Sequence, residues 1–508
     1  MAPTFAWPLL FIGLSMLYLL LSAGQGRNNA FIIGWAFGFG YFLFGLHWIG
    51  NALLIDGNPF FWAYPLAVSV LPAYLALYFG LAAKLITKLC LRHLSSWFCF
   101  GGVITVTEWL RGTLFTGFPW NLFGYTWGAP YTLSVAQGVS VFGVYGLTWA
   151  TVLAATLPAL LFLNRKNALR ASAATAIVAA LTGGLIVYGA QRLENNPTEY
   201  YKDINLRIVQ PNIPQHLKWE AEHQTEIFFK HLRLSSVNYN RTADKNIVIW
   251  PETAVNPGIL ENPDALEYIA RTLLAIPGES ILMAGALQKH AAGAEEPEYY
   301  NSLVVIDEKG KKIASYDKTH LVPFGEYLPF EDIIPLEPVV GLSGLKPGPA
   351  KKTISLPEIP EFSPLVCYEV IFPGKVKASG LSESPDDEYG RPKWLLNVTN
   401  DAWYGDTAGP RQHFTISLFR AIEEGLPLVR SANTGISGVI DPLGRIVDKS
   451  EFNRDFYTDV YLPKSLKEKS YFFRYGHNIT ISIIAFSIFT YILILYVNRN
   501  KKIIEKLY

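Results

Sequence analysis

Cysteine is scarce in this chain, with three residues among 508, and none forms a Cys-x-x-Cys pair. The nine histidines are scattered singly, so neither a disulfide framework nor a zinc site is expected. A Gly-rich phosphate loop, a Gly-x-Ser-x-Gly elbow and a His-Glu-x-x-His helix are absent as well. These absences remove most rival chemistries, and nothing in the sequence calls for a metal or a cofactor.

An excess of charge of one sign is also missing, because 43 Lys and Arg residues face 42 Asp and Glu residues. A net charge of +1 argues against a nucleic-acid partner. The charges are unevenly placed, however. Before about residue 191, apolar windows of roughly 20 residues follow one another, as in membrane-spanning helices, and 479–496 is apolar again. The stretch between them has the charge density of a water-soluble domain.

The apolar pattern predicts a polytopic α-helical membrane bundle. Because basic loops stay on the cytoplasmic side, alternation of the Lys- and Arg-rich loops places the N-terminus and the soluble domain outside the cytoplasm and the C-terminal tail inside. The expected domains are 1–190 with about six spans, an extracytoplasmic domain at 191–477, and 478–508 with one span and a basic tail. The expected spans are 8–24, 31–51, 60–83, 97–115, 131–163, 170–190 and 478–497, the fifth long enough to tilt or to extend beyond the bilayer.

The soluble domain alternates short β-rich runs with helical stretches. Runs at 204–210, 246–250 and 280–287 are separated by helical patterns at 219–235 and 263–274. Further runs follow as far as 431, and 438–447 is typical of a hairpin. This interleaving predicts an α/β layer structure.

Cys367 is isolated in this domain and directly follows an apolar, strand-like run. Such a cysteine is either core packing or a nucleophile. Glu252 and Lys318 also lie at the ends of strand-like runs, and in an α/β sheet strand ends converge on a ligand crevice. A base, a fixed cation and a thiol are what acyl transfer needs. Taken alone, each residue has a structural explanation: packing for the cysteine, a solvated surface for the charges.

In the expected catalytic site, Glu252 takes the thiol proton and returns it to the leaving group. Lys318 lowers the pKa of Cys367 and, with the backbone N–H that follows the cysteine, stabilises the oxyanion. Glu326 and Glu369 either hold the lysine or position an attacking amine, and Tyr368 is a further supporting residue.

A histidine base is the alternative to Glu252, with His320 and His413 as candidates. It would be redundant beside Glu252 and Lys318. In the membrane region, Glu108 has Arg111 one helical turn on, so it forms either an internal ion pair or a contact with a lipid headgroup. Cys90 and Cys99 flank a membrane boundary and are interpreted as packing.

The segment 327–342 is apolar but broken by prolines and glycines. It is either a loop packed on the domain or a hydrophobic lid that contacts lipid and guards an acyl-chain pocket. The candidate substrate contacts are Trp219, Tyr327, Phe330, Val339, Leu342 and Trp403.

Taken together, these motifs resemble the nitrilase superfamily, whose Glu-Lys-Cys triad occurs in this order. With the flanking membrane spans, the chain is similar to the apolipoprotein N-acyltransferase family over nearly its whole length. Segments 250–253, 316–318 with 323–326, and 367–369 correspond to the base, lysine and nucleophile motifs. The other matching segments are 108–112, 117–120, 210–215, 218–219 and 400–404.

The resemblance implies an αββα sandwich for the soluble domain and a two-step, ping-pong transfer without a cofactor. A phospholipid would acylate Cys367, and phosphatidylethanolamine is the expected donor. The thioester would then acylate the α-amino group of the N-terminal diacylglyceryl-cysteine of an apolipoprotein. The enzyme would lie in the bacterial inner membrane with its catalytic domain on the periplasmic side. Members of the family usually begin with one further transmembrane helix, so either the start lies downstream of that helix or this member lacks it.

Two other functions stay open at this point. A membrane-anchored, nitrilase-type amidohydrolase would use the same triad with water as the acceptor, although it would need neither an apolar lid nor seven spans. A transporter or receptor would bind a ligand without catalysis. Paired charges at the centre of the bundle would favour that class, and few are seen.

Overall fold

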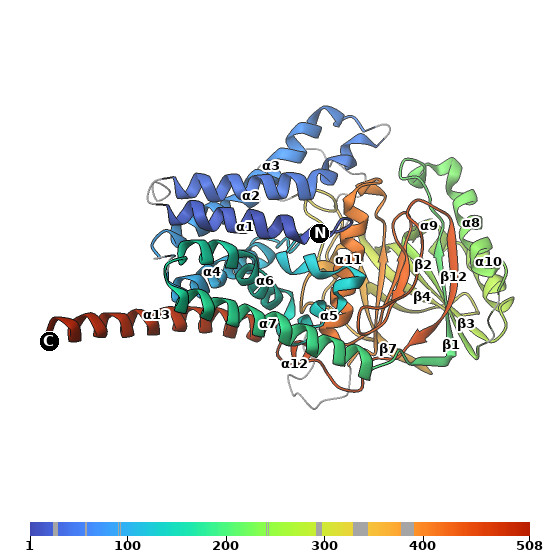
Figure 1. The fold of residues 1–508 in the computed structure, drawn as a ribbon. Helices are drawn as coiled ribbons and strands as arrows, with labels where there is room; N and C mark the ends of the chain where they lie inside the picture. Colours follow the sequence, from blue (N-terminus) through green and yellow to red (C-terminus); the bar gives the residue numbers. More distant parts are fainter. Residues whose placement is uncertain are drawn as a thin grey trace. The chain divides into compact units, whose positions relative to one another are not determined.

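The computed structural model describes residues 1–23, 29–55, 58–89, 91, 93–239, 241, 243–290, 297–328, 344–376 and 391–507 (Figure 1). The chain divides into two compact units, neither of which is continuous in sequence. A helical unit comprises Met1–His47, Pro65–Asn196 and Lys469–Tyr508. An α/β unit comprises Trp48–Tyr64 and Pro197–Glu468.

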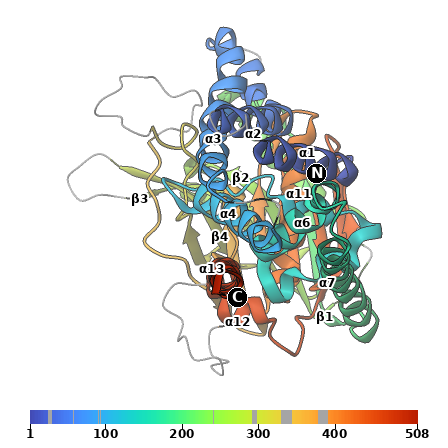
Figure 2. The same cartoon turned by 60° about the vertical axis from the view of Figure 1, so that its left-hand side comes forward.

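The helical unit is built around α6 (Val139–Leu163). This helix packs against α1, α4, α7, α12 and α13, and Figure 2 shows the bundle turned towards the viewer. The unit's remaining helices are α1 (Trp7–Ser22), α2 (Ala30–Leu46), α3 (Tyr64–Ile86), α4 (Leu94–Thr113), α5 (Leu133–Ala136), α7 (Ala168–Asn195), α12 (Tyr471–Tyr475) and α13 (His477–Leu507).

Each expected span overlaps one of these helices, but their membrane-spanning capacity differs. Two helices, α1 and the first part of α13 (His477–Leu493), are apolar but shorter than a full span. Helix α4 carries Glu108 and Arg111 and is not among the helices apolar enough to cross a membrane. The number of membrane crossings therefore stays a prediction. Four described segments are long and apolar enough to cross a membrane: Ala30–Leu54, Phe61–Ile86, Val139–Leu163 and Ala168–Asn195.

The expectation of one long helix over 131–163 is wrong. α5 ends at Ala136 and α6 begins only at Val139, and within α6 Gly143 is non-helical, with φ +65°. A Cβ at Gly143 would lie 2.3 Å from the ring of Phe472. The left-handed backbone and the close approach of this ring therefore require glycine here.

Glu108 and Arg111 form an internal ion pair, with 2.5 Å between Oε2 and Nη2, and both side chains are fully buried. Arg111 also donates to the carbonyl of Phe118 and lies over the ring of Phe42. The ion-pair interpretation is thus confirmed, and neither side chain is open to a headgroup. Cys99 is buried, as packing requires, whereas Cys90 lies outside the described residues.

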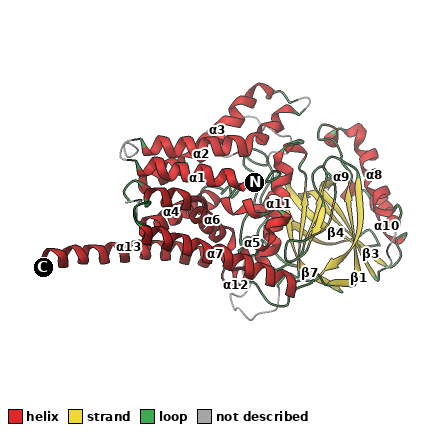
Figure 3. Ribbon diagram, viewed as in Figure 1, coloured by secondary structure: helices red, strands yellow, loops and turns green. Residues whose placement is uncertain are grey.

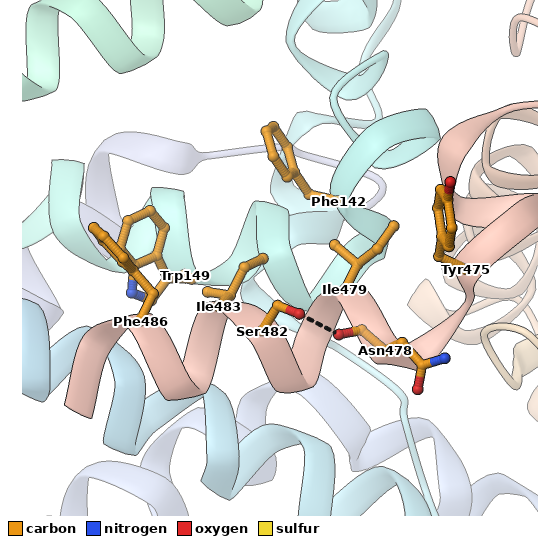
Figure 4. Close-up of a pocket in the computed structure, with 8 residues that line it drawn as sticks. All are labelled: Phe142, Trp149, Tyr475, Asn478, Ile479, Ser482, Ile483 and Phe486. Atoms are coloured by element: carbon orange, nitrogen blue, oxygen red, sulfur yellow. Dashed lines mark hydrogen bonds between the residues drawn. The ribbon is translucent and has the colours of Figure 1, made fainter. Parts of the chain in front are cut away.

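A groove runs along the outside of this unit between α6 and α13 (Figure 4). Phe142 and Trp149 line it from α6, and Ile479, Ile483 and Phe486 line it from α13. The lining is mainly apolar, which suits helix surfaces that face lipid tails.

The α/β unit contains two six-stranded sheets (Figure 3). Helices α8 (Gln224–Ser236), α9 (Pro257–Glu261) and α10 (Pro263–Leu274) pack on the first sheet, and α11 (Ala408–Glu424) packs on the second. The αββα sandwich is therefore confirmed. The first sheet has the order β12 (Phe456–Pro463), β1 (Tyr200–Gln210), β2 (Lys245–Val255), β3 (Glu279–His290), β4 (Glu298–Ile306), β5 (Lys312–Asp317). The second has the order β11 (Ile446–Lys449), β10 (Gly438–Ile440), β9 (Leu428–Ala432), β8 (Trp394–Thr399), β7 (Ile359–Val366), β6 (Ile354–Leu356).

Apolar side chains from both sheets meet between the layers, among them Ile208, Ile249, Val366 and Val398. Strands β1, β2 and β3 are parallel, and so are β7, β8 and β9. Carboxyl ends of parallel strands lie at one edge of a sheet, where a ligand crevice forms. Residues near this end of β2 and directly after β7 are therefore placed to form a site.

Candidate active site

Cys367 directly follows β7 and opens a 3₁₀ turn, Cys367–Ile371. It is 7% exposed and has φ +51°, a left-handed conformation that is uncommon for a residue with a Cβ. The turn is held on both sides of the cysteine. Asn397 Nδ2 donates to the carbonyls of Leu365 (3.0 Å) and Cys367 (3.3 Å), and Val366 N–H donates to Glu369 Oε2 (2.8 Å). Backbone strain that is over-determined in this way is typical of functional sites.

Lys318 comes directly after β5 and lies between two carboxylates. Its Nζ is 2.8 Å from Glu326 Oε2 and 3.8 Å from Glu252 Oε1, and all three side chains are buried. Glu252 lies inside β2, where the pairing with β3 is irregular between Trp250 and Val255, so the expectation that it ends the strand is wrong. Both Glu252 and Lys318 lie within electrostatic range of the Cys367 thiol. The three residues expected to form the triad are thus brought together.

Asn301 of β4 connects the two carboxylates, and sequence reasoning missed it. Its Nδ2 donates to Glu252 Oε1 (2.7 Å) and to Glu326 Oε1 (2.8 Å). Glu326 Oε2 also accepts from Val322 N–H (2.8 Å). The only signal in the sequence was a polar residue within an otherwise apolar run, which also fits an ordinary strand end.

The charges of the site influence one another strongly. Burial raises the pKa of Glu252, with a further rise from Glu326, while Lys318, the Asn301 hydrogen bond and Lys218 act to lower it. Burial alone would lower the pKa of Lys318, but the carboxylates of Glu326 and Glu252 raise it above its ordinary value. Lys318 therefore remains a cation throughout the physiological range.

The Cys367 thiol is not activated at rest. Burial and the Glu252 carboxylate raise its pKa, and they outweigh the opposing effect of Lys318. Lys318 acts in the expected direction, but it does not make the net pKa of the thiol low. A neutral thiol beside a carboxylate requires proton transfer during attack, which is general-base catalysis.

Glu369 does not contact Lys318, contrary to one of its two expected roles. It pairs instead with Lys351, whose Nζ lies 2.8 Å from Oε1. The same oxygen accepts from Tyr316 Oη (2.7 Å) and from Thr319 Oγ1 (2.8 Å). Burial opposes ionisation, yet Lys351 and these donors lower the pKa of Glu369 to about 2. Glu369 is therefore ionised at neutral pH, and its carboxylate holds the turn that carries Cys367.

Neither candidate histidine is arranged as a base for the thiol. Burial lowers the pKa of His320 to about 4, and its ring packs on Phe372 with 4.0 Å between ring centroids. His413 Nδ1 lies 3.0 Å from Asp401 Oδ1, and its ring interacts with the backbone of Cys367. Arg430 Nη2 completes this buried cluster, 2.7 Å from Asp401 Oδ2.

Three of the six candidate substrate contacts lie within the described residues. Trp219 is 38% exposed, and Tyr327 and Trp403 are partly buried. Tyr368 is buried and packs on Phe372 with 5.1 Å between ring centroids. The other three candidates, Phe330, Val339 and Leu342, lie outside the described residues, as does most of the segment interpreted as a lid. Within the described part of the chain, no three His, Cys, Asp or Glu side chains cluster as metal ligands do.

Comparison with known proteins decides the family. Residues 1–157 match the family model of the apolipoprotein N-acyltransferase N-terminal domain, and 205–459 match the carbon-nitrogen hydrolase model. The chain is 40% identical over 482 residues to an apolipoprotein N-acyltransferase of Rhodopseudomonas palustris, covering 91% of this chain and 87% of the relative. The chain belongs to the apolipoprotein N-acyltransferase family.

Other apolipoprotein N-acyltransferases agree with this assignment. The protein of Sinorhizobium fredii is 41% identical over 440 residues, which cover 85% of this chain and 79% of the relative.

Among solved structures, an amidase from Nesterenkonia sp. AN1 is similar at 18% identity with a TM-score of 0.34, covering 53% of this chain and 93% of the amidase. The family assignment rests on the sequence relatives. Together with the membrane-capable helices, it makes this chain a membrane protein of an acyltransferase family.

Proposed function

We propose that this chain transfers a fatty acyl chain from a phospholipid to the α-amino group of the N-terminal diacylglyceryl-cysteine of an apolipoprotein, the last step of bacterial lipoprotein maturation. The observation that carries the proposal is Lys318, held between Glu252 and Glu326 with the Cys367 thiol in electrostatic range. This is the arrangement of base, cation and nucleophile that acyl transfer needs, in a chain of this family.

In the first step, Cys367 Sγ attacks the ester carbonyl of the phospholipid while Glu252 takes the thiol proton. Lys318 and the Tyr368 N–H stabilise the oxyanion. The ester C–O bond then breaks, and Glu252 returns the proton to the leaving lysophospholipid oxygen. The result is a thioester on Cys367.

In the second step, the acceptor amine attacks the thioester carbonyl and gives a proton to Glu252. The C–S bond breaks, the proton passes to Sγ, and the product is an amide. Because donor and acceptor use the same site in turn, the kinetics are ping-pong. Glu326 orients Lys318 in both steps through their 2.8 Å ion pair.

The proposed location is the bacterial inner membrane, with the α/β unit on the periplasmic side and phosphatidylethanolamine as the donor. The distribution of basic loops supports this orientation. Both substrates are lipids, and a soluble enzyme would have to extract each from the bilayer at a cost of about 0.8 kcal/mol per buried CH₂. A membrane-bound enzyme avoids that extraction.

The test is intact-protein mass spectrometry after incubation with phosphatidylethanolamine, with and without a diacylglyceryl-cysteine peptide. An acyl-sized adduct should form in the wild type and pass to the peptide. It should be absent in Cys367→Ala, while Cys99→Ala, which removes a buried cysteine of α4, should retain it. Discharge that is equally fast in water alone would indicate a hydrolase, and a folded wild type that forms no adduct would refute covalent catalysis at Cys367.

A further inference from the structure

Lys218 is a second buried lysine beside the candidate base, and the mechanism above does not use it. It lies in the 3₁₀ turn Leu217–Trp219 and is 6% exposed. Its Nζ donates to the main-chain carbonyl of Glu252 at 2.9 Å. Gln224 Nε2 fixes the turn by donating to the Lys218 carbonyl at 2.7 Å. One hydrogen bond therefore holds the ammonium, and the other holds the main chain that carries it.

Among the side chains that the structure describes, this ammonium has no carboxylate partner of its own. Within the described residues, no carboxylate oxygen lies within 4.0 Å of Lys218 Nζ. Lysine is rarely buried unless it is paired, because desolvation of the charge is costly. Burial accordingly lowers the pKa of Lys218 to about 8, and the charges of Glu252 and Cys367 limit that fall. Lys218 therefore remains mainly protonated at neutral pH, with the Glu252 carboxylate as its principal countercharge.

The carbonyl that Lys218 binds belongs to a tightly constrained segment of β2. The next residue, Thr253, has φ +49°. On the opposite side, a Cβ at Gly285 of β3 would lie 2.4 Å from Glu252 Cα and from the Pro251 carbonyl oxygen. The backbone of Glu252 is thus held between a glycine that allows close approach and an ammonium that binds its carbonyl.

We propose that Lys218 is a positioning residue for Glu252: it fixes the Glu252 main chain and supplies a second buried positive charge that favours the carboxylate form of the base. The inference rests on the proposed function, because it assigns Glu252 the role of general base. Lys318 favours the carboxylate form as well, but its charge is shared with Glu326, which lies nearer to it, at 2.8 Å against 3.8 Å for Glu252.

The other groups around this pair do not replace Lys218. Glu252 also faces Glu326, Cys367 and Tyr404, none of which is a cation. Lys218 also faces His231 of α8, whose pKa is lowered to about 4, chiefly by burial. His231 is therefore neutral at working pH, and removal of Lys218 leaves Lys318 as the principal positive charge near the base.

The test is the pH dependence of single-turnover thioester formation from phosphatidylethanolamine, between about pH 5.5 and 8.5. In Lys218→Met the pKa of Glu252 should rise further, because a nearby positive charge is lost. The rate of thioester formation should therefore fall most at the acidic end of this range, by up to about tenfold, and least at the alkaline end. Lys218→Arg should show the wild-type pH profile, because it keeps the positive charge. Lys230→Met is the matched control, since Lys230 lies on α8 and pairs with Asp455 at the surface.

A rate that falls equally at every pH would overturn the electrostatic role, and an unchanged profile would overturn the whole inference. Lys218→Gln keeps a hydrogen-bond donor without the charge, so it tests the same shift if Lys218→Met fails to fold. A wild type that forms no adduct would refute the proposed function itself. The two failures are therefore distinguishable.

Discussion

Replacement of Glu369 by glutamine is expected to destabilise the α/β unit and misplace the nucleophile. The Glu369 carboxylate joins the turn that carries Cys367 to Lys351 and to the residues that follow β5. An amide keeps the shape but loses the charge, and its NH₂ group cannot accept the hydrogen bonds that an oxygen accepts. The buried Lys351 ammonium would then be left without its anion.

The size of the effect follows in two ways. A shift of the carboxyl pKa from 4.5 to about 2 corresponds to about 3 kcal/mol. Removal of one partner of a buried ion pair typically costs about 3–5 kcal/mol. The free energy of unfolding should therefore fall by about 3–4 kcal/mol in Glu369→Gln.

The pH dependence has a definite sign. The folded-state pKa of Glu369 is depressed, so its contribution is fully present above the unfolded value of 4.5. The contribution is lost as the pH falls towards about 2. Stability differences between wild type and Glu369→Gln should be constant at neutral pH and shrink below about pH 4.5.

Thermal and denaturant unfolding of the purified protein measure this difference, and thioester formation reports on the cysteine turn. Glu267→Gln is the control, because its surface pair with Arg271 should contribute at most about 1 kcal/mol. The double variant Lys351→Met/Glu369→Gln should recover part of the lost stability, since no unpaired charge is left. The reasoning is wrong if Glu369→Gln lowers the free energy of unfolding by no more than the control does. It is also wrong if the double variant loses as much stability as Lys351→Met and Glu369→Gln lose in sum.

Two further predictions concern the neighbours of Glu252. Glu326→Gln removes the closer carboxylate from Lys318, so the cation should move towards Glu252. Thioester formation should then slow by at least tenfold, while the melting temperature should change less than in Glu369→Gln. An unchanged rate would contradict the orienting role of Glu326. Gly285→Ala places a methyl group 2.4 Å from the Glu252 Cα. The free energy of unfolding should fall by about 1–3 kcal/mol, and turnover should be reduced. Wild-type stability and activity in this variant would show that β2 can shift to make room without affecting the site.

The sequence was most informative where chemistry follows the end of a strand. Lys318 and Cys367 were predicted from that position and from the motifs around them, and both directly follow strands. Glu252 was predicted in the same way but lies inside β2, and the sheets bring the three residues together. The hairpin around Asp441 is confirmed by β10 and β11, and the helical pattern at 263–274 corresponds to α10. These features depend on local periodicity and turn chemistry, which a sequence displays directly.

The features that sequence reasoning missed depend on partners that are distant in the chain. Nothing near Glu369 indicates Lys351, and nothing near Glu252 indicates Asn301 or Lys218, because these contacts arise only when strands and turns converge. The helix expected from 219 begins at 224, since Gln224 and the preceding 3₁₀ turns serve the site instead. The net rise in the pKa of Cys367 was also out of reach, because it depends on burial.

Trp48–Tyr64, between α2 and α3 in the chain, groups with the α/β unit. Trp48 donates from Nε1 to Gln412 Oε1 at 3.1 Å, and its ring lies 4.5 Å from that of Tyr404. A truncated protein that starts at residue 197 would therefore lack an integral piece of its own catalytic fold and would expose the surface that Trp48 covers. Anyone who wants a soluble version of this enzyme would have to graft that segment back or redesign the uncovered surface.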